Sequence, residues 1–443
     1  MKIQLSDHFT YGKLIRFTMP SVIMMLFISV YGVVDGFFVS NLVGKTAFAA
    51  LNLIMPFLQI IGGVGAMLGV GGSALVAKTL GAGNNLRANR YFTMMMYLMV
   101  ITGLVLSALG IVFIRPVAYL LGATEALIED CVIYGRTTLI FNIALHAQYT
   151  FQNYMIVAEK PKMGLLVTVL AGMTNMILDF VFMAVFNFGI AGAALATGLS
   201  QVVGGAIPFL WFLSKKNKSA LHFAKTRFEI KPMVKACTNG ASEMLTSVSG
   251  SITGILYNLQ LIKYAGEDGV AAYGVVMYAA WIFIAIFMGF CTGGSPIMSY
   301  HFGAQNYSEM KNLLKKNTTF LAILGTVLTI IAVILAKPIS HIFVGYDANL
   351  MNITVRAFMI CAIPFLYMWF NMYTSSFFTA LNDGAVSAAI SLMRALLLPV
   401  LCITTLPIFF KLDGVWYSLV LSELLGIMVS VFFIIRKRKK YHY

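Results

Sequence analysis

Long apolar stretches alternate with short polar connections along almost the whole chain. Most of these stretches have about 20 residues or more, which is the length that an α-helix needs to cross the hydrocarbon of a bilayer. The pattern predicts twelve such segments, at residues 14–39, 48–77, 91–114, 128–157, 163–186, 190–213, 235–262, 270–300, 318–336, 350–381, 385–409 and 414–435. We therefore expect an all-α integral membrane protein with twelve transmembrane helices.

The composition agrees with this expectation. Hydrophobic residues make up 60% of the 443 residues and charged residues only 11%, whereas a soluble domain averages about 45–50% apolar and 25% charged residues. The formal net charge of +15 would fit nucleic-acid binding, but the basic residues occupy the short connections and the C-terminal end, as in membrane proteins. We expect the lipid bilayer, and no nucleic acid, as a partner.

The basic residues are also distributed unequally between the two sides of the predicted bundle. One side holds most of the 31 Lys and Arg residues, including a cluster at 215–235 and another at 436–440. The connections on the other side hold only Lys45, Arg115, Lys263, Lys337 and Lys411. Because cytoplasmic connections carry the excess of positive charge, both termini are predicted to be cytoplasmic.

A second copy of a glycine-rich motif indicates an internal repeat. The matching pairs, all separated by the same number of residues, are Gly71-Gly72-Ser73 with Gly293-Gly294-Ser295, Gly81-Ala82 with Gly303-Ala304, and Asn84 with Asn306. An even number of helices per repeat gives both halves the same orientation, so we expect two parallel six-helix pseudo-repeat lobes with substrate at their interface. The predicted boundaries are an N-lobe over 1–213, a polar and basic cytoplasmic linker over 214–232, a C-lobe over 233–435 and a basic cytoplasmic tail over 436–443.

Two aspartates interrupt apolar segments at comparable depth. Asp35 lies near the outer end of the first segment and Asp179 near the outer end of the fifth, and an ionisable residue inside a transmembrane helix is a functional candidate by default. Asn175 lies one turn before Asp179 on the same helix face, and Thr197 of the sixth segment could add a hydroxyl. These groups predict either a proton site, created by burial and mutual repulsion of the carboxylates, or an oxygen cage for a monovalent cation. The structural alternative is that each aspartate merely caps a helix or faces an outer vestibule.

Polar side chains inside two further segments predict the walls of a wet cavity, because unpaired polar groups avoid lipid. In the fourth segment these residues include Tyr134, Gln148, Gln152 and Asn153, and in the tenth they include Asn371 and Tyr373. Aromatic residues in such a lining can also bind cations through their ring faces. We expect substrate to contact these two segments.

The remaining candidates are charged or conformationally special residues. Glu243 of the seventh segment is expected to assist coupling, to recognise substrate charge or to pair with Arg394, whereas Glu423 is expected to be structural. Pro20 removes a helix hydrogen bond and offers a bend in the first segment. The five cysteines have no CxxC spacing, and the glycine-rich stretch 63–72 lacks the Lys-Ser/Thr ending of a P-loop. We therefore expect no metal site, no cofactor, no enzymatic activity and no ATP-driven transport.

Several stretches together resemble one known family. The stretches are VVDGFFVSNLVG at 33–44, GGSALVAKTLGAGN at 71–84 with its second copy at 293–306, AEKPKMG at 158–164, and NMILDFVFM at 175–183. They look like the multidrug and toxic compound extrusion (MATE) family, closest to its MepA- and DinF-like bacterial branches. The likeness covers essentially the whole chain, including the plan of twelve helices in two lobes.

The resemblance implies two six-helix lobes that exchange a cation for an amphipathic, usually cationic drug. The residues that it implies are the coupling carboxylates Asp35 and Asp179, their polar companions Asn175, Thr197 and Tyr134, the bending proline Pro20, the substrate-facing amides Gln148 and Gln152, and the acidic position Glu243. Sodium-coupled relatives of the NorM type carry an aspartate in the tenth helix, whereas residues 365–378 contain none. This departure argues against a sodium site in the C-lobe and favours coupling through the N-lobe.

The function that we expect is that of a secondary multidrug antiporter in a bacterial cytoplasmic membrane. As a monomer it would export cationic drugs or dyes in exchange for H⁺ or Na⁺ by alternating access, and so contribute to antibiotic resistance. A flippase for lipid-linked precursors, of related architecture, is the alternative; it would need cations in its cavity, where only Arg394 lies at mid-depth. A transporter of the major facilitator plan would carry a charged motif where LGAGNNLRANRY stands at 80–91, and a channel would carry a filter-like repeat.

Overall fold

The computed structural model describes residues 3–443, and residues 1 and 2 of the predicted N-lobe lie outside the described residues. Helices account for 88% of the structure, and no strand occurs within residues 3–443. The first half contains α1 (Tyr11–Phe38), η1 (Val39–Val43), α2 (Lys45–Gly81), α3 (Asn85–Leu120), α4 (Ile128–Ile140), α5 (Asn142–Val157), α6 (Pro161–Asp179), η2 (Phe180–Val185) and α7 (Gly189–Leu213). The second half contains α8 (Ile230–Gly303), α9 (Tyr307–Val344), α10 (Ala348–Ala362), η3 (Ile363–Leu366), α11 (Met368–Ala380), α12 (Gly384–Leu392), η4 (Met393–Leu397) and α13 (Leu398–Tyr441). The η segments are π-helical turns, except η3, which is a 3₁₀ turn.

Nine helical stretches in the described part of the chain are long and apolar enough to cross a membrane. Two of these stretches each contain two membrane crossings, because α8 breaks at Gly266 (φ 60°, ψ −147°) and α13 breaks at Lys411 (φ 51°, ψ −126°). α4 and α5, separated only at Phe141, form one further crossing. The predicted all-α architecture with twelve transmembrane helices is therefore confirmed for residues 3–443.

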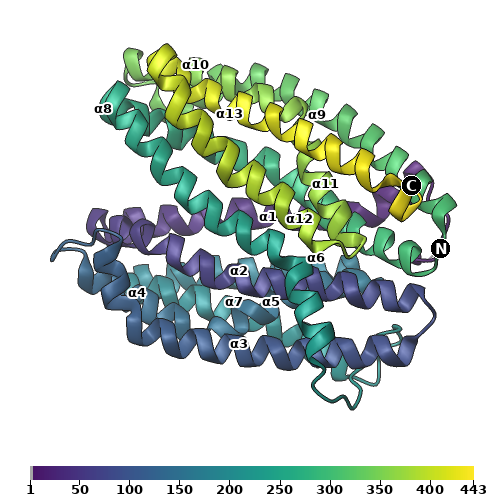
Figure 1. Ribbon diagram of the computed structural model, residues 1–443. Coiled ribbons are helices and arrows are strands. Elements are labelled where there is room, and N and C mark those ends of the chain that lie inside the picture. The colour runs from purple at the N-terminus through teal and green to yellow at the C-terminus, as the bar shows by residue number, and fades with distance from the viewer. Residues whose placement is uncertain (1–2) are drawn as a thin grey trace.

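The helices form two bundles that meet where α1 and α2 pack against α8. Figure 1 shows most of the elements that precede α8 in one bundle and those that follow it in the other, with both termini at the same end of the molecule. α1 contacts both α6 of the first bundle and α8. The predicted arrangement of two lobes is thus confirmed. The domain boundaries remain a prediction; the structure ends α7 at Leu213 and begins α8 at Ile230.

The sequence repeat corresponds to a symmetrical contact between the lobes. A Cβ atom on Gly81 of α2 would collide with the carbonyl oxygen of Tyr300 in α8, and a Cβ atom on Gly303 of α8 would collide with the carbonyl oxygen of Lys78 in α2. Gly81 is the repeat counterpart of Gly303, and Lys78 is the counterpart of Tyr300. The motif glycines therefore allow α2 and α8 to cross with their backbones in contact, which no side chain would permit. We call this contact the glycine crossing.

Several helices extend beyond the apolar segments that predicted them. α9 begins at Tyr307 instead of residue 318, because Oδ1 of Asn306 accepts a hydrogen bond from the Glu309 N–H at 3.1 Å and caps the helix. α13 continues to Tyr441, so most of the tail predicted over 436–443 is helical. An apolar pattern reveals only the part of a helix that lies in hydrocarbon, whereas caps and backbone hydrogen bonds extend it into water.

The residues before α1 join the two lobes at the end where the termini lie. The N–H of Leu5 donates to Oε1 of Glu159, between α5 and α6, at 2.9 Å. The N–H of Phe9 donates to Oε1 of Glu309 in α9 at 2.9 Å, and Nδ1 of His8 lies 2.5 Å from Oε2 of the same carboxylate. Leu5 and Phe9 are both buried. This N-terminal strap, residues 3–10, therefore bridges an N-lobe connection and a C-lobe helix.

The C-terminal end of α13 is held against the turn between α11 and α12. The Tyr441 hydroxyl donates to Oδ2 of Asp383 at 2.6 Å, and the Nζ atoms of Lys437 and Lys440 lie 3.4 and 3.7 Å from the same oxygen. Burial alone would raise the pKa of Asp383, but the Tyr441 hydrogen bond and the two lysine charges outweigh burial and lower the pKa below its ordinary value. The ionised carboxylate is thus the form that stabilises this contact.

Candidate functional site

Asp35 and Asp179 meet in the interior of the N-lobe. Asp35 lies in the last turns of α1 and is 9% exposed, and Asp179 is the last residue of α6 and is fully buried. Their carboxyl groups lie close enough for one, when protonated, to donate a hydrogen bond to the other. Two ionised carboxylates at this separation repel each other strongly in a medium of low dielectric. A proton or a cation between the two carboxyl groups would relieve this repulsion.

The three polar companions predicted from the sequence lie beside this pair. Asn175 is one turn before Asp179 in α6, and its Nδ2 donates to Oγ1 of Thr197 in α7 at 3.4 Å. The Tyr134 hydroxyl of α4 is near Thr197 and both carboxylates. The structure thus brings together five side chains from four helices, α1, α4, α6 and α7.

The buried oxygens of this cluster lack donors. Oδ1 of Asp35, both carboxylate oxygens of Asp179 and Oδ1 of Asn175 have no hydrogen-bond partner among residues 3–443. Burying an unpaired carboxylate is expensive unless it is neutralised or coordinates an ion. The cluster is therefore suited to binding a proton or a small hard cation.

Two π-helical turns adjoin the acidic pair, and the apolar pattern of the sequence does not predict them. η1 follows α1 directly after the turn that contains Asp35, and η2 begins at the residue after Asp179. The two π-helical turns also contact each other. Such turns are rare in proteins, and those that occur are often found at functional sites. The extra residue in the turn disturbs the regular hydrogen bonding of the helix. Both carboxylates thus lie next to a local irregularity of the backbone.

Two further residues near the cluster were missed by the sequence analysis. Tyr31 lies one turn before Asp35 and close to it in α1, and Thr138 lies one turn after Tyr134 and close to its hydroxyl in α4. The spacing of four residues was the available signal, since it places both on the same helix faces as the predicted residues.

The amides predicted to face substrate lie on α5, but they differ in their surroundings. Gln152 is buried, and its Nε2 donates to Oγ1 of Thr168 in α6 at 3.3 Å. Gln148 packs against Gly204 of α7, and Asn153 against Gly69 of α2. These contacts turn the three side chains toward three different helices, so binding of one substrate by all three remains a prediction.

In the C-lobe, Arg394 is paired with Glu423 of α13. The Nε of Arg394, in η4, lies 2.8 and 3.1 Å from the two carboxylate oxygens of Glu423. Nδ2 of Asn371 donates to Oε2 of Glu423 at 2.8 Å, and Ser430 donates to Oδ1 of Asn371 at 2.8 Å. The Asn371 amide is fully buried and bonded at both ends. Its proposed contact with substrate remains a prediction, and it would require these hydrogen bonds to break.

Glu243 and Tyr373 occupy other parts of the C-lobe. Glu243 lies on α8 near Arg394 and Cys291, yet it makes no ion pair within the described residues, so the alternative in which it pairs with Arg394 is not the arrangement observed. The Tyr373 hydroxyl accepts a hydrogen bond from Nδ2 of Asn317 in α9 at 3.0 Å. Neither residue is in contact with the acidic pair of the N-lobe in the structure.

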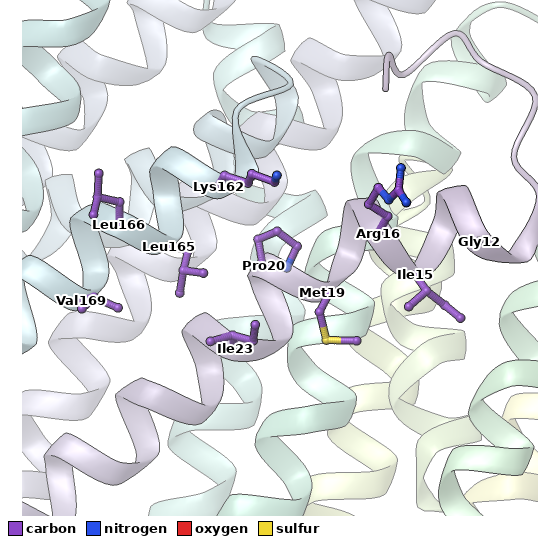
Figure 2. Close-up of a pocket in the computed structure, with 10 residues that line it drawn as sticks. All are labelled: Gly12, Ile15, Arg16, Met19, Pro20, Ile23, Lys162, Leu165, Leu166 and Val169. Carbon is purple, nitrogen blue, oxygen red and sulfur yellow. The ribbon is translucent and has the colours of Figure 1, made fainter. Parts of the chain in front are cut away.

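Pro20 is buried in the first half of α1, and this helix continues through it without a break. It lines a groove between α1 and α6, which Figure 2 shows in close-up. A proline leaves one backbone carbonyl without its helical partner and makes a bend there less costly. The predicted bending role is thus placed at the boundary of these two helices and remains a prediction.

Comparison with known proteins adds a family and a set of structural neighbours. The family model described as MatE matches residues 20–181 and 244–404. The multidrug export protein MepA of Staphylococcus saprophyticus is 23% identical over 419 residues, covering 93% of this chain and 91% of that protein. The MepA of Staphylococcus aureus strain N315 is 23% identical over 431 residues, covering 95% and 92%.

Solved structures share the fold over nearly the whole length. A crystal structure of MATE in complex with MaL6 superposes with a TM-score of 0.92 at 21% identity, covering 98% of both chains. A MOP superfamily transporter from Pyrococcus furiosus, described as having a binding pocket of reversed polarity, has a TM-score of 0.91 at 22% identity and the same coverage.

Proposed function

Because this chain belongs to the MatE family of membrane transporters, which are not enzymes, we propose that it is a secondary antiporter that exports cationic amphipathic drugs in exchange for H⁺ or Na⁺. The relatives named for multidrug export support the export of drugs. The single observation that carries the coupling is the pair of buried carboxyl groups, Asp35 and Asp179, whose buried oxygens lack donors in the described chain. The ion is cargo in this proposal, and no resident cofactor takes part.

The coupling follows from the charge of the acidic pair. When the pair is ionised, the N-lobe interior attracts a cationic drug; when a proton or a sodium ion enters, the charge falls and so does the affinity for the drug. By linkage, the drug weakens binding of the ion to the same degree. Asn175, Thr197 and Tyr134 supply the neutral oxygens that would complete a cation cage or would hydrogen-bond to a protonated carboxyl.

The other intramembrane charges also favour cationic substrates. The only basic residue predicted at mid-depth, Arg394, is neutralised by Glu423 at 2.8 Å. Asp35, Asp179 and Glu243 have no basic partner among the ion pairs of residues 3–443. The interior therefore carries unpaired acids, whereas a flippase for lipid-linked pyrophosphates would need unpaired cations.

The orientation belongs to the same proposal. Both termini, the tail of α13 and the N-terminal strap lie at one end of the molecule (Figure 1), and the sequence puts most of its basic residues on this side. We place this end in the cytoplasm of a bacterial cell. The glycine crossing closes the two lobes there, which corresponds to an outward-facing state. One chain contains both lobes, so the proposed unit is a monomer.

The test is transport of a cationic dye by purified protein in proteoliposomes. A pH gradient and a sodium gradient are imposed separately on the wild type, on Asp35→Asn and on Asp179→Asn. The matched control is Glu129→Gln, which removes an exposed acid that pairs with Arg115 in the same lobe. We expect one of the gradients to drive transport in the wild type and in the control, and both Asn variants to lose it by at least about tenfold.

The two gradients separate the coupling ions. Transport under the pH gradient alone would assign a proton site to the acidic pair, and transport under sodium alone would assign a cation cage. Full transport by Asp35→Asn would remove Asp35 from the coupling site. Failure of both gradients to move the dye, with salt-sensitive binding of an anionic lipid precursor instead, would favour the flippase alternative.

A further inference from the structure

The groove between α1 and α6 is an apolar trough with two cations at one end. Its volume is about 820 Å³, and the wall comes from the first half of α1 and the first half of α6. Figure 2 shows Arg16 and Lys162 at the upper rim, with Ile23, Leu165 and Val169 extending away from them along the two helices. We propose that this groove binds one anionic glycerophospholipid, with its phosphate between Arg16 and Lys162 and an acyl chain along the apolar floor.

The length of the groove matches one leaflet. Its α1 wall extends from Gly12 to Ile23, which is about 17 Å along a helix axis. The hydrocarbon core of a bilayer is about 30 Å thick, so the groove covers roughly one acyl chain, from the headgroup region to the midplane. Met19 and Ile23 are 40% and 44% exposed. In a membrane these side chains face lipid tails.

The charges at the rim select an anion. Arg16 and Lys162 are exposed, and neither makes an ion pair or a side-chain hydrogen bond within residues 3–443. None of the 10 lining residues is acidic. Lys162 also belongs to the first turn of α6, whose positive helix end adds to the attraction for a phosphate. An arginine and a lysine at the level of the headgroups form a suitable partner for a phosphodiester.

The positive charges of Arg16 and Lys162 argue against the transported substrate as the occupant of the groove. The substrate proposed above is cationic, and two unpaired cations at the rim would repel it. The groove is therefore not an entry route for substrate. The lipid site depends on the membrane embedding of the chain and not on the coupling ion, so it can fail independently of the proposed antiport.

The location gives the lipid a mechanical consequence. Pro20 forms part of the wall, at the point where α1 lacks a backbone hydrogen bond. A lipid seated there fills the space between α1 and α6 and opposes any movement of α1 into the groove. Occupancy of the groove by lipid is thereby linked to the position that α1 can take beside α6.

The test is native mass spectrometry of the purified protein titrated with phosphatidylglycerol or, separately, with phosphatidylcholine. A basic residue near a membrane surface contributes about fivefold to the binding of an anionic lipid. We therefore expect Arg16→Gln and Lys162→Gln each to weaken retention of the first phosphatidylglycerol about fivefold, and the double variant about 25-fold. The matched control is Arg90→Gln with Lys315→Gln, which removes the same charge from exposed positions at the same end of the molecule.

A second pair of variants tests the apolar floor with the charges intact. Val169→Trp fills the groove, whereas Leu170→Trp places the same ring at the neighbouring, 41% exposed position outside it. We expect Val169→Trp to lose the bound lipid and Leu170→Trp to keep it. Equal retention of the two lipids by the wild type, or equal losses in the groove variants and their controls, would overturn the proposal. Displacement of the lipid by free glycerophosphate at similar concentration would also overturn it, because the headgroup alone would then account for binding.

Discussion

Gly303 lies where α8 crosses α2, and its replacement by alanine tests the glycine crossing directly. A Cβ atom there would stand 2.7 Å from the carbonyl carbon of Lys78 and closer still to its oxygen. Ordinary carbon–carbon contacts begin at about 3.5 Å, so the two helices would have to separate by about 1 Å. The obstacle is backbone in helix α2, which cannot rotate away as a side chain would.

The expected effect is a loss of the state in which the lobes are closed at this end. Overpacking of a close contact costs about 1–3 kcal/mol, which reduces the ratio of closed to open molecules by a factor of about 5 to 150. Gly81→Ala should act in the same way, because its Cβ would collide with the Tyr300 carbonyl oxygen. The matched control is Gly254→Ala in the same helix α8, where a Cβ atom would meet nothing within 4 Å. That control should stabilise the helix by about 0.5–1 kcal/mol.

The assay is a distance measurement between two spin labels by pulsed electron resonance. Labels at Leu86 of α3 and Lys311 of α9 report on the two lobes at this end, and both positions are exposed. Of the five cysteines only Cys237 is not buried, so Cys237→Ser gives a suitable background. We expect Gly303→Ala to shift the distance distribution toward longer values and Gly254→Ala to leave it unchanged. Identical distributions for the two variants would refute the argument that backbone contact at Gly303 holds the lobes together.

Three further predictions concern the polar contacts that support the fold. Glu309→Leu removes the acceptor of the Phe9 N–H. A hydrogen bond to a charged group contributes about 1.5–3 kcal/mol, so hydrogen exchange of the N-terminal strap should become about 10- to 150-fold faster. An unchanged exchange rate would show that Glu309 does not hold the strap against α9. The pKa of Asp383 is lower in the folded protein than in the unfolded chain, so the ionised carboxylate stabilises the fold fully above its ordinary pKa, and this stabilisation is lost as pH falls through the folded pKa. Asp383→Asn should therefore have a lower melting temperature than the wild type at pH 7 and the same melting temperature at strongly acidic pH. A difference in melting temperature that persists in acid would contradict the lowered pKa. Arg394→Met leaves the Glu423 carboxylate without its counter-charge and should lower the stability of the fold by about 3 kcal/mol. The double variant with Glu423→Met should have a stability closer to that of the wild type. If thermal unfolding ranks the double variant lowest, the ion pair itself is stabilising.

The pattern of apolar segments predicted the membrane class and the number of helices, because the hydrocarbon core imposes a minimum length on each crossing. It did not predict where the helices end. Asn306 caps α9 well before its apolar part, and α13 continues through basic residues to Tyr441. These polar turns lie outside the hydrocarbon, where hydropathy carries no information about helix formation.

The candidate coupling site was predicted in composition but not in geometry. Asp35 and Asp179 stood out because each is a lone carboxylate in an apolar segment, and the turn spacing added Asn175. Whether the two carboxylates would meet depends on the packing of α1 against α6, which is a contact between segments far apart in the sequence. The π-helical turns after both residues could not be anticipated, because a single extra residue per turn leaves no mark on the apolar pattern.

The sequence alone determined that the chain crosses the membrane, that it has two related halves and that acidic residues outnumber basic residues at mid-depth in its helices. These properties depend on local hydropathy, on repeated motifs and on residue identity. Only the tertiary structure decided which charges pair: it joined Arg394 to Glu423, left Asp35 and Asp179 facing each other, and formed a cationic rim from Arg16 and Lys162. Such pairings are set by distances between helices that are remote in sequence, and electrostatic energy depends on those distances and on the surrounding dielectric.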